Sequence, residues 1–156
     1  MVEQLLSNPD EFDFLLETHQ QIEVQLAQQD HRYTNSRRQL VEVLSKAGHP
    51  MALPNIVAAD PALAQSSVYR NLNVLVRSGV IRRINTGGDH AYFELAEPLL
   101  AHHHHLICMS CGAIQDIYLT SEVEMLVDRN LAEVALESGF TPIYHNLDLH
   151  GHCANC

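Results

Sequence analysis

Apolar residues recur at helical spacing through the first half of the chain. This pattern predicts helices over 10–29 and 36–47, a short helix near 54–60, and a helix over 65–79. In the first of these, Phe14, Ile22 and Leu26 repeat near helical spacing. The second can be capped by Thr34 and stops at Gly48.

The segment 65–79 has the most regular amphipathic pattern. Its inward positions, at i, i+4, i+7 and i+8, are Val68, Leu72, Leu75 and Val76. Ser66 or Ser67 can cap its start and Gly79 can end it. This spacing turns Tyr69, Arg70 and Asn73 outward together.

Two short alternating segments follow, 80–85 and 90–95, and TGGD between them is typical of a hairpin turn. Three helices and then a hairpin is the order of a winged helix-turn-helix. In that arrangement the last helix enters the major groove of DNA and the hairpin contacts the phosphate backbone. The first half is therefore predicted to bind DNA.

The second half has a different pattern. It predicts strands over 102–108, 112–119 and 140–151, with an amphipathic helix over 121–138. The boundary is placed at 97–98. We therefore predict an α+β protein with an N-terminal winged-helix domain, residues 1–97, and a C-terminal α/β domain, residues 98–156.

Four cysteines form two C-x-x-C pairs, CMSC at 108–111 and CANC at 153–156. Four thiolates at two chain turns form the donor set of a closed tetrahedral zinc site, which is structural because it has no open position. Such a site contributes directly to folding. The predicted zinc ligands are Cys108, Cys111, Cys153 and Cys156.

The run HHHH at 102–105 precedes the first C-x-x-C. On a strand, alternate side chains point to opposite faces. His103 and His105 should therefore point one way, and His102 and His104 the other, which predicts two metal sites back to back. Further ligands must come from elsewhere in the chain, and the candidates are His49, Asp89, His90, Glu94, Asp116, Glu124 and His145.

Charge is distributed unevenly along the 156 residues, although the chain as a whole carries −10. Residues 1–30 carry −7, residues 31–85 carry +6 and residues 86–156 carry −9. The basic middle segment fits nucleic-acid binding, which the net charge conceals. No apolar run approaches the roughly 20 residues that span a membrane. The first residues are acidic, unlike a secretory signal, so we expect a cytoplasmic protein with reduced thiols and no membrane partner.

The arrangement SSVYRNL, GVIRRI, YFEL, HHHHLICMSCG and a distant G-x-C-x-x-C resembles the ferric uptake regulator family of metal-dependent repressors. The match runs from about residue 32 to 156. The resemblance implies a homodimer whose C-terminal domain is the dimerisation domain, and a pseudo-palindromic double-stranded DNA operator. It also implies a regulatory metal at the hinge between the domains.

The resemblance assigns residues to three roles. The hinge metal would be held by His49, Glu94, His103, His105 and Asp116. A second site would be held by His102, His104, Glu124 and His145, with Glu122 as an alternative to Glu124 because the preceding loop is one residue longer than the family pattern. DNA contacts would come from Arg32, Ser67, Tyr69 and Arg70. The acidic N-terminal extension is longer than is usual in the family.

The hinge ligands are all nitrogen or oxygen donors, because the cysteines are assigned to structural Zn²⁺. This set suits Fe²⁺ or Mn²⁺ and also binds Zn²⁺. Asp116, where the family more often has Glu, resembles the peroxide-sensing branch. We expect iron sensing first, then zinc, then manganese or peroxide.

Two other classes of protein remain as alternatives. A zinc hydrolase is disfavoured because the chain has no H-E-x-x-H motif and its clearest zinc site is closed. A metal-storage protein would account for the histidines, but it would leave the basic winged-helix half unexplained. We therefore expect a regulator and not an enzyme.

Overall fold

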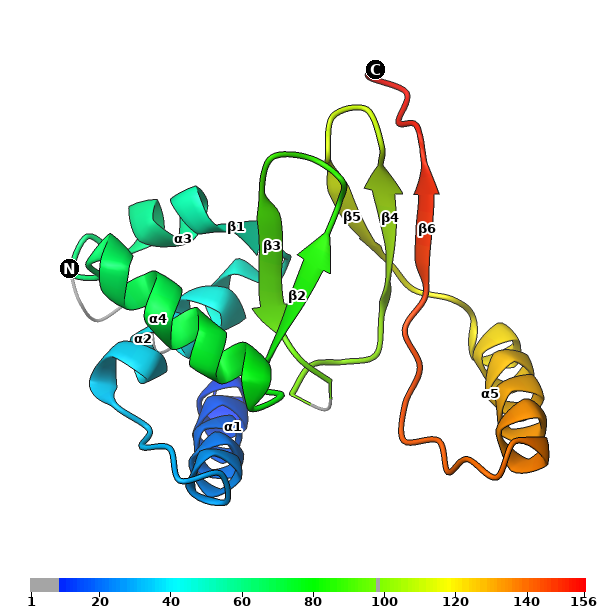
Figure 1. Ribbon diagram of the computed structural model, residues 1–156, viewed down its shortest axis with the longest axis horizontal. Helices are drawn as coiled ribbons and strands as arrows, with labels where there is room; N and C mark the ends of the chain where they lie inside the picture. The colour runs from blue at the N-terminus through cyan, green and yellow to red at the C-terminus, as the bar shows by residue number, and fades with distance from the viewer. Residues whose placement is uncertain (1–8, 98) are drawn as a thin grey trace.

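The computed structural model describes residues 9–97 and 99–156, with side chains described from residue 14 onward in the first helix. Figure 1 shows two groups of elements side by side, each built around its own small sheet. The first group contains α1 (Pro9–Ala27), α2 (Asn35–Ala47), β1 (Met51–Ala52), α3 (Leu53–Ala59), α4 (Gln65–Arg77), β2 (Ile81–Asn85) and β3 (Ala91–Leu95). The second contains β4 (His104–Cys108), β5 (Ile114–Ile117), α5 (Ser121–Glu137) and β6 (Asp148–Gly151). The α+β fold with a winged-helix first half is as predicted.

The first group has one hydrophobic core beneath a sheet of order β1-β3-β2. On α4, the predicted inward residues Val68, Leu72 and Leu75 are buried, and Tyr69 is 61% exposed. This separation follows from the 3.6-residue repeat of the helix. It leaves the polar face of α4 on the surface of the first half.

Three local predictions were wrong. Helix α4 begins at Gln65 with Ala64 as its N-cap, so Ser66 and Ser67 lie inside the first turn and do not cap it. Phe14 is 48% exposed, because α1 packs through Ile22 and Leu26 instead. The predicted strand 140–151 is regular only from Asp148, because residues 140–147 form the connection from α5 to the sheet.

The described part of the acidic extension, helix α1, packs on the core of the first half. Ile22 and Leu26 are fully buried there, and Gln25 and Gln29 each donate a side-chain hydrogen bond to the carbonyl of Ser78 at the end of α4. These contacts hold α1 beside the C-terminal end of α4. Among the described residues, no helix is both long enough and apolar enough to cross a membrane.

Candidate metal centres and nucleic-acid interface

Strand β4 is the centre of the second sheet, which has the order β5-β4-β6. β5 pairs with it in antiparallel fashion and β6 in parallel fashion, so His105 lies opposite Asp116 on one side and Asp148 on the other. The strand begins with His104 and His105 and ends at Cys108, and His102 and His103 come immediately before it. Three groups of metal-ligating side chains are therefore arranged along one strand.

The cysteine cluster consists of Cys108, Cys111, Cys153 and Cys156, whose sulfurs lie within 4.8 Å of one another. Sulfur–sulfur distances are 3.6 Å for Cys108–Cys156, 3.7 Å for Cys111–Cys153 and 3.3 Å for Cys153–Cys156. Four sulfurs about 2.3 Å from one tetrahedral zinc ion would be roughly 3.8 Å apart. A disulfide needs about 2.05 Å. The cluster therefore fits a zinc ion better than it fits disulfides.

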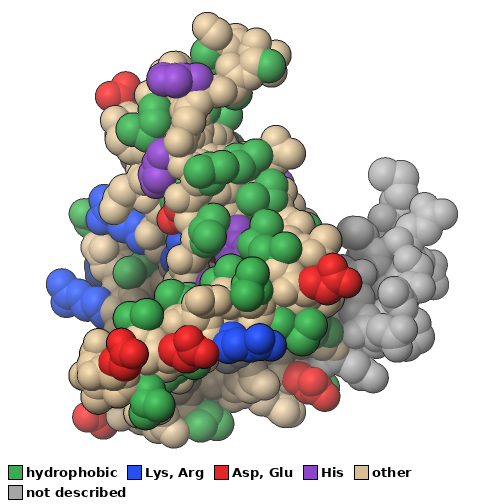
Figure 2. Space-filling model, turned by 90° about the vertical axis from the view of Figure 1, so that its right-hand side faces the viewer, with side chains coloured by type: hydrophobic (Ala, Val, Ile, Leu, Met, Phe, Trp, Pro, Cys, Tyr) green, Lys and Arg blue, Asp and Glu red, His purple; other side chains and the backbone are tan. Residues whose placement is uncertain are grey.

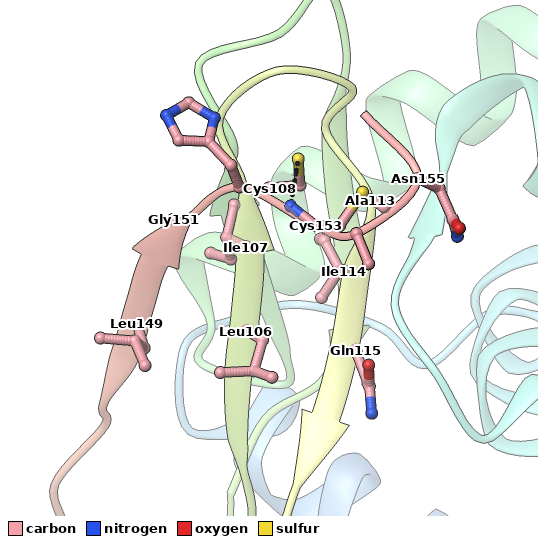
Figure 3. Close-up of a pocket in the computed structure, with 12 residues that line it drawn as sticks. Leu106, Ile107, Cys108, Ala113, Ile114, Gln115, Leu149, Gly151, Cys153 and Asn155 are labelled. Carbon is pink, nitrogen blue, oxygen red and sulfur yellow. Dashed lines mark hydrogen bonds between the residues drawn. The ribbon is translucent and has the colours of Figure 1, made fainter.

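Backbone geometry prepares the cysteine cluster for a cation. Cys153 follows β6 and donates its backbone N–H to the sulfur of Cys108 at 3.3 Å, drawn as a dashed line in Figure 3. Hydrogen bonds from the backbone of Cys111 and of Cys153 lower the pKa of Cys108 to about 5. These hydrogen bonds favour the thiolate of Cys108, the form that binds metal.

The bridging cluster consists of Glu94, His103, His105 and Asp116. Glu94 Oε2 lies 3.1 Å from His103 Nε2 and 3.3 Å from His105 Nε2, and Asp116 Oδ1 lies 3.8 Å from His105 Nε2. Glu94 belongs to β3 in the first sheet, whereas the other three belong to the second half. This is the group in which side chains of both halves converge.

Tautomers in the bridging cluster favour metal ligation through Nε2. His103 Nδ1 lies 2.9 Å from the carbonyl oxygen of Ala101 and His105 Nδ1 lies 3.0 Å from Asp148 Oδ1. Both partners can only accept, so both Nδ1 atoms carry hydrogen. Each ring would therefore bind a metal ion through Nε2, in place of its present contact with Glu94. Burial opposes ionisation of Glu94, but hydrogen bonds from His105 and His103 outweigh it and lower the pKa of Glu94. An ionised carboxylate therefore faces two imidazole nitrogens.

His49, the fifth predicted hinge ligand, lies outside the four-residue group. It lines a cavity of about 200 Å³ together with Glu94, His103 and Asp116. Its Nδ1 lies 3.0 Å from the carbonyl oxygen of Pro50, which leaves Nε2 free. His49 therefore stands on the wall of the site, and its role as a ligand stays a prediction.

The second histidine cluster consists of His102, His104, Glu124 and His145, on the opposite face of β4. Three Nε2 atoms converge on Glu124, at 3.3 Å from His102, 2.9 Å from His104 and 3.4 Å from His145. Outer carboxylates hold two of the rings by Nδ1: Glu97 holds His102 at 2.8 Å, and Asp128 holds His145 at 2.9 Å. This is the two-sided division that strand alternation predicts.

Unsatisfied polar atoms gather at these two clusters. Within the described residues, four buried ligand-cluster atoms have no hydrogen-bond partner: His104 Nδ1, Asp116 Oδ1, Glu124 Oε2 and His145 Nε2. Buried polar atoms without a partner cost free energy, so each requires an explanation. One divalent ion at each cluster would satisfy Asp116 in the bridging cluster and Glu124 and His145 in the second histidine cluster. The nitrogen and oxygen donors fit Fe²⁺, Mn²⁺ or Zn²⁺.

Glu124, and not Glu122, faces the second histidine cluster, because α5 begins at Ser121 and turns Glu122 to solvent. We expect Glu124→Gln to lower the affinity of this site by more than the roughly 10–100-fold that loss of an outer carboxylate costs. Isothermal titration with Zn²⁺ should then show one fewer tight ion per chain. The matched control Glu122→Gln should keep the full number. If both variants bind like the wild type, Glu124 is not a ligand.

The candidate DNA interface lies on the first half. Tyr69 and Arg70 are exposed on α4, Arg32 is exposed before α2, and Ser67 is half-buried in the first turn of α4. The three exposed side chains are therefore accessible to a partner, and their DNA contacts stay a prediction.

Two residues beside the bridging cluster, Arg82 and Asp148, were not predicted from the sequence. Arg82 on β2 donates from one nitrogen to both carboxylate oxygens of Asp148 on β6, at 3.0 Å each. The sequence does contain a sign of Asp148: it is a charged residue in a strand of alternating apolar residues, just before G-x-C. Only the sheet order shows that it lies beside His105.

A winged-helix unit joined to a second sheet through converging imidazoles and carboxylates defines a class of metal-dependent DNA-binding proteins. The family model described as ferric uptake regulator family matches residues 28–150, and the chain belongs to that family. The ferric uptake regulation protein of Campylobacter jejuni is 32% identical over 152 residues, 94% of this chain and 90% of that protein. The peroxide operon regulator of Bacillus subtilis is 30% identical over 131 residues, 80% of this chain and 83% of that protein.

Solved structures agree with this family. The Helicobacter pylori ferric uptake regulator, described as having three functional metal-binding sites, aligns with a TM-score of 0.67 at 25% identity, covering 91% of this chain and 93% of that one. Members of the family are transcription regulators and not enzymes, as expected from the sequence. The hydrolase alternative is thereby set aside.

Helix α5 carries its apolar residues on the surface of the single chain. Figure 2 shows apolar side chains gathered on the side of the molecule where α5 lies. The exposed fractions are 57% for Leu126 and 60% for Val134, and in the following segment 69% for Phe140 and 91% for Ile143. Such a large apolar surface is typical of a protein–protein interface.

Proposed function

We propose that this protein is a cytoplasmic, homodimeric, iron-responsive repressor that binds a pseudo-palindromic DNA operator when its bridging cluster is loaded. Family membership makes it a metal-responsive transcription regulator. The apolar surface of α5 and residues 140–143 supplies a face for the second copy. The chain leaves the first sheet before residues 97–98 and enters the second sheet after them, which fits a domain division at this point.

One observation carries the regulatory part of the proposal: the bridging cluster draws Glu94 from one sheet and His103, His105 and Asp116 from the other. A divalent ion bound there would supply positive charge to carboxylates of both halves. These side chains can converge on one point only when the two sheets keep this relative position. That position favours one spacing of the two α4 helices in the dimer, as two successive major-groove half-sites require.

The donor chemistry fits iron, the metal that we place first. With the sulfurs committed to the cysteine cluster, the bridging cluster offers only nitrogen and oxygen, which suits Fe²⁺ and Mn²⁺. Two observations support a peroxide-sensing or manganese-responsive alternative: an aspartate at 116, and the 30% identity to a peroxide operon regulator. Zinc responsiveness is the third candidate, because Zn²⁺ outranks both metals in affinity for such donors.

The test is the DNA affinity of the zinc-loaded dimer at matched free concentrations of Fe²⁺, Mn²⁺ and Zn²⁺, without oxygen. The DNA is selected by the metal-loaded protein from a random pool, and binding is followed by fluorescence anisotropy. We expect a gain of about 5–150-fold on adding the physiological metal. The gain at saturation should be largest with Fe²⁺, although Zn²⁺ binds at a lower free concentration because of its higher affinity for these donors. Equal DNA affinity with each metal and with chelator would reject the proposal.

A further inference from the structure

Asp148 on β6 makes two contacts that connect a buried ligand with the other half of the molecule. Its Oδ1 accepts from His105 Nδ1 at 3.0 Å, and both of its oxygens accept from Arg82 at 3.0 Å. Arg82 also lies 3.6 Å from Glu94 Oε1. His105, Asp148, Arg82 and Glu94 therefore form a closed ring of contacts that crosses from the second sheet to the first and back.

The contact with Asp148 determines which nitrogen of His105 is free. Arg82 also lies near His105 Nδ1, at 3.4 Å, but guanidinium can only donate, whereas carboxylate can only accept. The shorter contact, to Asp148, therefore decides that Nδ1 carries the hydrogen. Nε2 then points at Glu94 and Asp116, where a bound cation would take the place of its present contact with Glu94. A carboxylate on Nδ1 is the arrangement that orients a ligating histidine.

Burial makes this ring more than a surface ion pair. The side chain of His105 has no exposed area, that of Glu94 is 5% exposed, and those of Arg82 and Asp148 are 21% and 26% exposed. One guanidinium nitrogen of Arg82 contacts both oxygens of Asp148, and such charge-assisted hydrogen bonds are stronger than neutral ones. Sheet order supplies the position, because His105 and Asp148 are partners in the parallel register of β4 and β6.

We propose that Asp148 and Arg82 are positioning residues for the bridging cluster. Asp148 holds His105 in the tautomer and orientation that present Nε2 to the ion, and Arg82 ties that carboxylate to β2. Orientation of the ligand and the relative position of the two halves are thereby set together. This inference rests on the proposed metal-responsive function.

The experiment compares wild type with Asp148→Ala, using Co²⁺ as the probe on zinc-loaded protein. Affinity is measured by titration against a competing chelator, and the ligand geometry by visible absorption of the bound ion. We expect one Co²⁺ equivalent to weaken by about 10–100-fold, with a changed absorption spectrum. Asp148→Asn, which keeps an accepting oxygen for Nδ1, should lose less. The control is Asp89→Asn, which should match wild type. Asp89 was a candidate ligand, but it is exposed in the turn between β2 and β3 and lies outside all three ligand clusters.

Arg82→Ala added to Asp148→Ala should weaken Co²⁺ binding by less than the product of the two single effects, because the two residues share the Arg82–Asp148 contact. Any further loss would come from the contact of Arg82 with Glu94. Circular dichroism and zinc content establish that each variant is folded. If the ion pair were purely structural, Asp148→Ala would lower thermal stability but leave the Co²⁺ affinity and the absorption spectrum unchanged. That result would overturn the proposal. If wild type still requires metal for DNA binding, only the positioning role is lost. If wild-type DNA binding is indifferent to metal, the proposed function itself fails.

Discussion

Replacing both His103 and His105 with alanine is expected to abolish the metal dependence of DNA binding while the chain stays folded and dimeric. These two imidazoles supply two of the four donors of the bridging cluster. Their removal leaves two carboxylates from different sheets, Glu94 and Asp116, which hold a transition-metal ion weakly without nitrogen donors. The gain of about 5–150-fold in DNA affinity on adding metal should fall to none, measured by fluorescence anisotropy.

The fold should survive this double substitution, because the β4 ladder is made by backbone groups and Leu106 and Ile107 remain. Size-exclusion chromatography and zinc content check this point. The matched control His90→Ala with His150→Ala removes two exposed imidazoles outside the bridging cluster and should keep the full metal response. A double variant at 103 and 105 whose DNA binding keeps its wild-type metal dependence would show that the cluster is not regulatory.

Replacing Cys108 with serine is expected to unfold the second half, and not only to remove the metal response of DNA binding. Cys108 is buried at the end of β4 and belongs to the group that ties residues 153–156 to this strand. Structural zinc sites in small domains contribute about 10–16 kcal/mol at neutral pH, which is comparable with the whole stability of a typical domain, about 5–15 kcal/mol. We therefore expect loss of bound zinc and of the cooperative thermal transition of this half.

The control for this experiment is Ser110→Ala, which alters the same chain turn without removing a sulfur. It should retain one zinc per chain by mass spectrometry under native conditions, and its thermal transition should resemble that of wild type. A Cys108→Ser protein that keeps its zinc and its melting temperature would contradict a structural role for the cysteine cluster.

Local periodicity was sufficient to place the helices of the first half. Val68, Leu72 and Leu75 repeat at helical spacing and are buried, because an amphipathic helix must cover a core. Helix caps were less predictable: α4 begins at Gln65, as predicted, but its N-cap is Ala64 and no side chain caps it. Periodicity did not predict that Leu126 and Val134 on α5 would be exposed. The apolar face of a helix has the same sequence pattern whether it packs on its own core or on a second chain.

The division of the four histidines followed from strand geometry alone. Alternation separates His103 and His105 from His102 and His104, and the structure places the two pairs in different clusters. Partners from distant segments needed either the family resemblance or the sheet order. Asp148 illustrates the limit: 43 residues separate it from His105, and only the parallel pairing of β6 with β4 brings the two together.

The central claim is that one ion must be shared between the two sheets, and Glu94 is the one member of the bridging cluster that comes from the first sheet. The most direct measurement is the DNA affinity of Glu94→Ala at saturating metal, with occupancy of the cluster verified in the same sample and Glu122→Gln as the control. His103, His105 and Asp116 should still hold the ion at high concentration, yet DNA affinity should stay at the metal-free level. If the loaded variant instead gains DNA affinity as fully as wild type, metal does not act by joining the two halves.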